Sequence, residues 1–137
     1  ATHKTTKNIL KRKAFTVSMA EAGQITACDY VGIVSGNKVE DKFTKAGFHA
    51  IKSEFVDAPL IEELSVAVAC KLIDFNPETG ILRGEIVNVS VDERVLDENG
   101  KVDAAKVQPI VFDPFNNDYL KVGEKVGKAF SDGKQLK

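Results

Sequence analysis

The first residues of the chain combine several side chains that bind anions. They bring hydroxyl groups, an imidazole and an ammonium group into one short stretch, formed by Thr2, His3, Lys4, Thr5 and Thr6. A helix capped by Thr2 and running to Lys13 is expected here. The free N–H groups and positive dipole end of such a helix favour an anion. The stretch is therefore a candidate phosphate site, although on the residues alone a capped helix start with a solvated polar face is the preferred interpretation.

The other reactive residue types do not form a recognisable catalytic or metal-binding motif. The two histidines, His3 and His49, lack metal-ligand spacing, and His49 is expected to have a structural role. Cys28 and Cys70 form no CxxC motif, so we expect two reduced thiols, with Cys70 buried on a strand. We predict no bound metal and name no catalytic acid or base.

The composition is typical of a globular protein. Of 137 residues, 43% are hydrophobic and 28% are charged, which predicts one domain over residues 1–137. No apolar run is long enough to cross a membrane, and the first twenty residues lack the apolar core of a secretion signal. With two unpaired cysteines, these features predict a cytoplasmic protein.

The charge distribution bears on possible partners. Residues 1–20 contain five basic and no acidic side chains, which leaves −6 on the remainder within a total of −1. The acidic remainder, and the absence of aromatic residues among these lysines, argue against nucleic acid as a partner.

The elements expected to position these residues are short helices and strands. Alternation from Phe15 to Met19 predicts a strand, and helices are predicted over about 26–34, 40–46 and 104–107. Strands are predicted over 109–112 and 119–122, followed by a short helix within 122–130 and a frayed tail over 131–137. The expected fold class is mainly β with short helices, or α+β.

The middle of the chain predicts a β-hairpin. One strand runs through residues 65–72, the loop signal Asn-Pro-Glu-Thr-Gly occupies 76–80, and a second strand runs from Ile81 to Asp92. After Ile86 the apolar positions of the second strand shift by one residue. This shift predicts a bulge or a sharp coil, as closure of a small barrel requires.

Several longer segments together resemble one known family. They are ATHKTTKNI at 1–9, AFTVS at 14–18, DYVGIVSG at 29–36, DKF at 41–43, AGF at 46–48, APLIEE at 58–63, GEI at 84–86, VLD at 95–97, Tyr119, Gly123 and GKAF at 127–130. In this order they are similar to the flavin reductase-like proteins, including flavoredoxins, over nearly the whole chain.

The resemblance implies an FMN-binding split β-barrel, commonly a homodimer, with FMN held noncovalently near the subunit interface. The cofactor-binding residues that it implies are Thr2, His3, Lys4, Thr5, Lys42, Phe112 and Phe115. Residues 2–5 of this set would surround the flavin phosphate, and Lys42 would lie near the cofactor. Either Phe112 or Phe115 would contact the flavin ring.

Three functions are compatible with this resemblance. The first is a flavin reductase-like oxidoreductase that transfers hydride or electrons between NAD(P)H and flavin. The second is a flavoredoxin-like FMN electron carrier that is served by a redox partner protein and has no nicotinamide turnover of its own. The third is a truncated domain that no longer binds flavin.

Two departures from the family pattern bear on that choice. Ile81 occupies a position where many relatives have a histidine. The chain is also expected to lack the N-terminal part of the domain, which in the family supplies early barrel strands and part of the flavin pocket.

Overall fold

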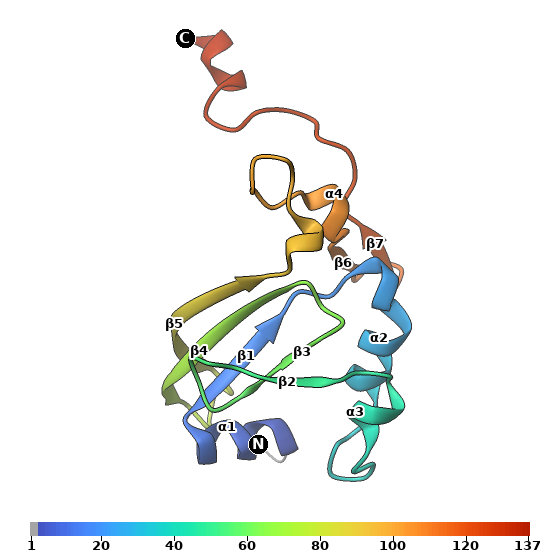
Figure 1. The fold of residues 1–137 in the computed structure, drawn as a ribbon, viewed down its shortest axis with the longest axis vertical. Coiled ribbons are helices and arrows are strands. Elements are labelled where there is room, and N and C mark those ends of the chain that lie inside the picture. The colour runs from blue at the N-terminus through green and yellow to red at the C-terminus, as the bar shows by residue number, and fades with distance from the viewer. Residues whose placement is uncertain (1–2) are drawn as a thin grey trace.

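The computed structural model describes residues 3–137 and confirms an α+β fold of antiparallel sheets and short helices (Figure 1). A three-stranded sheet lies at its centre, in the order β1 (Ala14–Ser18), β4 (Val66–Phe75) and β5 (Leu82–Val91). The central strand β4 carries the buried residues Ala67, Ala69 and Cys70. The core therefore follows β4.

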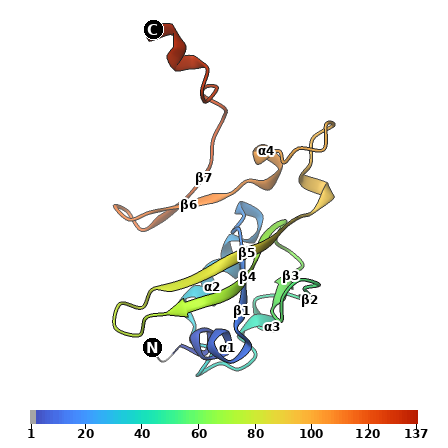
Figure 2. The same cartoon turned by 90° about the vertical axis from the view of Figure 1, so that its left-hand side faces the viewer.

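The phase change predicted in the second strand of the hairpin is confirmed as a register shift. Ala69 pairs with Asn88 and Cys70 pairs with Ile86, so Val87 is the extra residue on β5. A second shift follows between Leu72 and Asp74. Because a bulge bends a strand and increases its twist, the two shifts coil the long β4–β5 hairpin, seen from the side in Figure 2.

The remaining elements surround this sheet. In chain order they are α1 (Lys4–Arg12), η1 (Ala22–Gln24), α2 (Ile25–Ile33), α3 (Lys42–Lys45), β2 (Ala50–Lys52), β3 (Pro59–Ile61), η2 (Glu93–Val95), α4 (Ala104–Val107), β6 (Ile110–Asp113), β7 (Asp118–Lys121) and η3 (Asp132–Leu136), where η denotes a 3-10 helix.

Two small hairpins, β2–β3 and β6–β7, lie outside the central sheet. The Thr16 hydroxyl donates to the Pro59 carbonyl over 2.6 Å, which ties β3 to β1. Glu21 joins the segment after β1 to the start of β4, because one carboxylate oxygen accepts from both the backbone N–H and the hydroxyl of Ser65 at 2.5 Å. The first small hairpin is therefore attached to the central sheet.

A glycine is needed where the Phe15 ring crosses β5. A Cβ atom on Gly84 would lie only 2.5 Å from Cζ of Phe15 and 3.2 Å from Cβ of Cys70. Since the Phe15 ring and the Cys70 side chain occupy that space, β5 passes close to β1 and β4 only with glycine at this position.

Several predicted boundaries differ from the observed ones. The first helix has His3 at its N-cap, where Thr2 was expected, and Thr2 lies outside the described residues. The helix predicted over 40–46 is limited to Lys42–Lys45, and β2 and β3 were not predicted.

The helix predicted within residues 122–130 is wrong. Residues 122–128 have no regular secondary structure, and the tail over 131–137 contains η3. Gly123 and Gly127 in the first of these stretches disfavour a helix there. In Figures 1 and 2 this C-terminal segment points away from the central sheet.

Candidate functional site

The N-terminal end of α1 has free capacity for an anion. His3 at the N-cap makes no side-chain capping bond, and the first turn contains no acidic residue. The basic residues Lys11 and Arg12 lie in the last turn, where they complement the negative end of the helix dipole. Among residues 3–137, no side chain caps the first-turn N–H groups, which are therefore available to a ligand.

The structure brings most of the predicted phosphate residues together with Lys42. His3, Lys4 and Thr5 line a cavity of about 590 Å³, and Lys42 lines it from α3. The loop after α2 supplies Gly36 to the same cavity. Residues far apart in the sequence thus meet where α1 faces the end of α2. We call this the smaller cavity.

Gly36 allows both lysine side chains to approach the loop. A Cβ atom on this residue would lie 3.3 Å from Cδ of Lys4 and 3.5 Å from Cε of Lys42. Glu40 also lines the smaller cavity, and its side chain is exposed. The cavity therefore combines two ammonium groups with one solvated carboxylate.

The two lysines differ in their hydrogen bonds. The Lys42 ammonium donates to the carbonyls of Val31 and Val34, each over 2.8 Å, and so caps the C-terminal end of α2. No hydrogen bond or ion pair of the Lys4 ammonium is present among the described residues. Lys4 is therefore available to a ligand, whereas most of the donor capacity of Lys42 is used within the fold.

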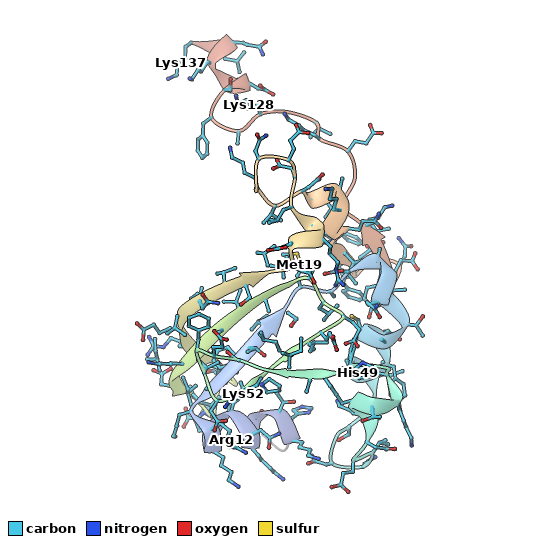
Figure 3. The ribbon with its side chains drawn as sticks, viewed as in Figure 1. Arg12, Met19, His49, Lys52, Lys128 and Lys137 are labelled. Atoms are coloured by element: carbon cyan, nitrogen blue, oxygen red, sulfur yellow. The ribbon has the colours of Figure 1, made fainter. Side chains whose placement is uncertain are left out.

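A larger cavity of about 1150 Å³ adjoins the first one. Its walls come from α1, β1, β2 and residues 53–58, with apolar side chains from Phe15, Val17, Ile51 and Phe55. Figure 3 labels Arg12 and Lys52, which line this cavity from α1 and from β2. The Arg12 guanidinium is already paired, since it donates to Asp57 over 2.8 Å.

One face of α1 forms a wall common to both cavities. Thr5 and Asn8 line both, and Ile9 and Arg12 continue the wall of the larger one. Positions 5, 8, 9 and 12 recur with helical spacing and therefore share a face. Sequence reasoning named Thr5 but missed Asn8, which this spacing could have identified.

The predicted aromatic contacts lie elsewhere in the chain. Phe112 packs against Tyr119 with ring centroids 5.8 Å apart, and Phe115 is 92% exposed at the β6–β7 turn. Neither residue lines either cavity. Figures 1 and 2 both place this hairpin away from α1, on the other side of the central sheet and before the C-terminal segment.

The remaining reactive residues have separate environments. Cys70 is buried as expected, and burial raises the pKa of its thiol. His49 is exposed, and its hydrogen bond with the Glu63 carboxylate raises the imidazole pKa. Ile81 lies just before β5, in neither cavity. None of these side chains contributes to the phosphate cluster.

Comparison with known proteins shows the family to which this chain belongs. The family model for the flavin reductase like domain matches residues 1–113. The chain therefore belongs to the flavin reductase-like family, and its expected split-barrel fold class is confirmed.

Two solved flavoredoxin structures are similar over most of the chain. The flavoredoxin of Desulfovibrio vulgaris (Miyazaki F) is 39% identical, with a TM-score of 0.88 over 96% of this chain and 71% of that one. The flavoredoxin from Methanosarcina acetivorans is 29% identical, with a TM-score of 0.87 over 99% of this chain and 72% of that one.

A third structure supports the fold alone. It is an FMN-binding domain of a flavin reductases-like enzyme from Shewanella baltica OS155, with 19% identity, a TM-score of 0.79 and coverage of 93% of this chain and 69% of that one.

A curated relative is longer than this chain. An uncharacterized protein of Aquifex aeolicus (strain VF5) is 34% identical over 108 residues, which make up 77% of this chain and 55% of that protein. The chain thus spans little more than half of that relative. Within residues 3–137, no helix is long and apolar enough to cross a membrane.

Proposed function

We propose that this domain binds FMN and acts as a flavin oxidoreductase that transfers hydride or electrons between NAD(P)H and the flavin. One observation carries the proposal. In a chain of the flavin reductase-like family, the uncapped start of α1 and the Lys4 ammonium face a small cavity that adjoins a large one lined by apolar side chains.

The donor set of the smaller cavity fits a phosphate group. First-turn N–H groups, the Thr5 hydroxyl and the Lys4 ammonium all donate, and Lys4 adds a compact positive charge. His3 lines the same cavity. Because these donors suit a phosphate, the proposed cofactor is a phosphorylated flavin, in preference to riboflavin.

The larger cavity fits the apolar part of the same ligand. Phe15 and Phe55 offer aromatic surface, and Thr5 and Asn8 connect this cavity with the phosphate site. When bound, the flavin supplies the redox chemistry. The protein's own residues would anchor the phosphate and orient the ring.

The flavoredoxin matches favour a second candidate function. Two structures of that name are 39% and 29% identical to this chain. In this alternative the domain holds FMN and exchanges electrons with a partner protein, without turnover of a nicotinamide. The proposed phosphate site would be the same, and only the electron donor would differ.

We also propose a homodimer as the working form. Phe112 and Phe115 lie away from both cavities of their own chain, so a contact between either ring and the flavin would come from a second copy. The expected cytoplasmic location stays a prediction.

Flavin reduction tests the proposal. The purified chain is mixed with FMN and freed of unbound flavin. Its visible absorption is then followed without oxygen after addition of NADH or NADPH. We expect retained flavin absorption that a nicotinamide bleaches.

The other outcomes separate the remaining candidates. Retained flavin that only a reduced redox protein can bleach would favour the flavoredoxin-like carrier. A colourless protein that takes up no FMN would contradict both flavin functions and support a domain that no longer binds flavin.

A further inference from the structure

The base of the β2–β3 hairpin brings together three side chains that the proposed flavin site does not use. His49 comes directly before β2, and Glu62 and Glu63 come directly after β3. Since Ala50 pairs with Ile61 across the hairpin, His49 and Glu62 lie at the next cross-strand position. The Glu62 N–H donates to the His49 carbonyl over 2.9 Å, which closes the base of the hairpin.

The side-chain atoms of these residues converge on one point. One ligand atom each from His49, Glu62 and Glu63 lies within 4.8 Å of the other two. Nδ1 of His49 lies 2.5 Å from one Glu63 carboxylate oxygen. The backbone N–H of His49 donates to the other carboxylate oxygen over 3.0 Å. The backbone thus holds the Glu63 carboxylate in a fixed orientation beside the imidazole.

The cluster carries two carboxylates, from Glu62 and Glu63. Arg94, which contacts the backbone of Glu63, is engaged with groups outside the cluster. Arg94 donates to the Glu63 carbonyl over 3.3 Å, and its Nε lies 3.7 Å from an Asp92 oxygen. A cation placed between the three side chains would offset the two carboxylate charges.

From this geometry we propose that His49, Glu62 and Glu63 form a binding site for a divalent transition-metal ion of the zinc type. One imidazole nitrogen and two carboxylate oxygens are ligands that Zn²⁺ accepts, whereas Mg²⁺ and Ca²⁺ prefer oxygen alone. With three protein ligands, a fourth position is left for water. Sequence reasoning missed this site because the ligands are separated along the chain and only the pairing of β2 with β3 joins them.

The site can accommodate the ion with a small movement. Zinc–ligand bonds of about 2.0–2.1 Å place neighbouring ligand atoms of a tetrahedral site roughly 3.3 Å apart. The contact of 2.5 Å between His49 and Glu63 must therefore lengthen. The His49 side chain is 72% exposed, so its ring is free to turn, while Glu63, at 19%, stays in place.

The ion would connect the two ends of a hairpin that also lines the larger cavity. Figure 3 labels His49 near one end of β2 and Lys52 at the other, and the residues after Lys52 form part of the cavity wall. A bound ion would therefore hold this wall in place without touching a ligand in the cavity. The metal proposal does not depend on flavin binding.

Calorimetric titration with zinc tests the site. The full chain carrying Cys28→Ser, which removes the more accessible thiol, is treated with a chelator, dialysed and titrated with ZnCl₂. We expect one Zn²⁺ per chain and a rise in the melting temperature with added Zn²⁺. His49→Gln, Glu62→Gln and Glu63→Gln should each weaken binding by roughly tenfold or more, since even residues outside the first ligand shell change metal affinity by about 10–100-fold.

Two substitutions serve as matched controls, and both should leave Zn²⁺ binding unchanged. His3→Gln removes the other imidazole of the chain, and Glu54→Gln removes an exposed carboxylate at the far end of the same hairpin. The proposal is overturned if the chain binds no Zn²⁺ or if His49→Gln keeps full affinity. Binding of MgCl₂ as tight as that of ZnCl₂ would also overturn it, because a nitrogen-containing site disfavours Mg²⁺.

Discussion

At the scale of single residues, Lys4 and Lys42 line the same cavity but have different roles. Lys42 is held by the carbonyls of Val31 and Val34, at the end of α2. Lys4 projects from the first turn of α1, where the helix dipole also attracts an anion. Removal of Lys4 should therefore affect ligand binding, and removal of Lys42 should affect the fold.

Lys4→Gln should weaken FMN binding by about tenfold or more and leave riboflavin binding nearly unchanged. A charged hydrogen bond contributes about 1.5–3 kcal/mol, and riboflavin has no phosphate to receive it. Fluorescence titration with both flavins measures the difference. Lys11→Gln, an exposed lysine of the same helix that lines neither cavity, is the matched control.

The substitution at the second lysine makes the test sharper. Lys42→Met should weaken both flavins alike and lower the melting temperature, because it leaves the Val31 and Val34 carbonyls without this donor. Equal loss of FMN and riboflavin in Lys4→Gln would contradict the phosphate assignment.

At the scale of elements, the β4–β5 hairpin determines how the central sheet is built. Val87 is the extra residue of one register shift, and the second shift lies close to Gly84. The ring of Phe15 covers the backbone at Gly84, so β1 and β5 approach each other around β4. Packing at this glycine therefore contributes to the stability of the whole sheet.

Gly84→Ala should lower the free energy of unfolding by about 1–3 kcal/mol, the usual cost of inserting an extra carbon into a packed interior. The new Cβ would lie 2.5 Å from the Phe15 ring. Urea unfolding followed by circular dichroism measures the loss. Gly123→Ala is the control, since a Cβ there meets no atom within 4 Å. Similar losses in both variants would show that the Phe15 contact is not the cause.

Local sequence patterns predicted some of these elements and not others. The shift at Val87 was predictable because a bulge reverses which side chains of a strand face the core. Strands β2 and β3 were not predictable, since each has three residues and β2 is exposed throughout. The helix predicted after Val122 is absent because no apolar face is buried there to stabilise it.

The candidate site shows the same division. The anion-binding character of Lys4 and Thr5 follows from residue type and from the helix start that they occupy. Their approach to Lys42 was expected only from the family resemblance, because no local pattern joins α1 to α3. The cluster at His49 depends in the same way on pairing between distant residues.

At the scale of the whole molecule, a C-terminal arm formed by residues 122–137 extends away from the central sheet. Val126, Phe130 and Leu136 on this arm are at least 93% exposed. The central hairpin also has exposed apolar side chains, among them Ile73 and Ile86. Large apolar side chains exposed to this extent are typical of a surface that contacts another protein, which supports the proposed homodimer.

If the proposed homodimer forms through this arm, replacing Val126, Phe130 and Leu136 by serine together should shift it toward monomer, with a dissociation constant raised by about tenfold or more. Sedimentation velocity at several protein concentrations measures the shift. A variant with Lys128→Ser and Lys134→Ser, which alters the same arm but keeps its apolar residues, should remain dimeric. Unchanged association in the serine variant would show that the arm does not hold the copies together.

Thr5 and Asn8 line both cavities, and this continuity has a consequence for ligand design. A molecule that occupies both cavities binds its second part at the high effective concentration set by the first. Its affinity would then exceed what either fragment achieves alone. Inorganic phosphate and a flavin ring without its phosphate-bearing side chain should each bind poorly to the domain, even when both are supplied together. Only the covalent link between the two parts makes the second contact intramolecular.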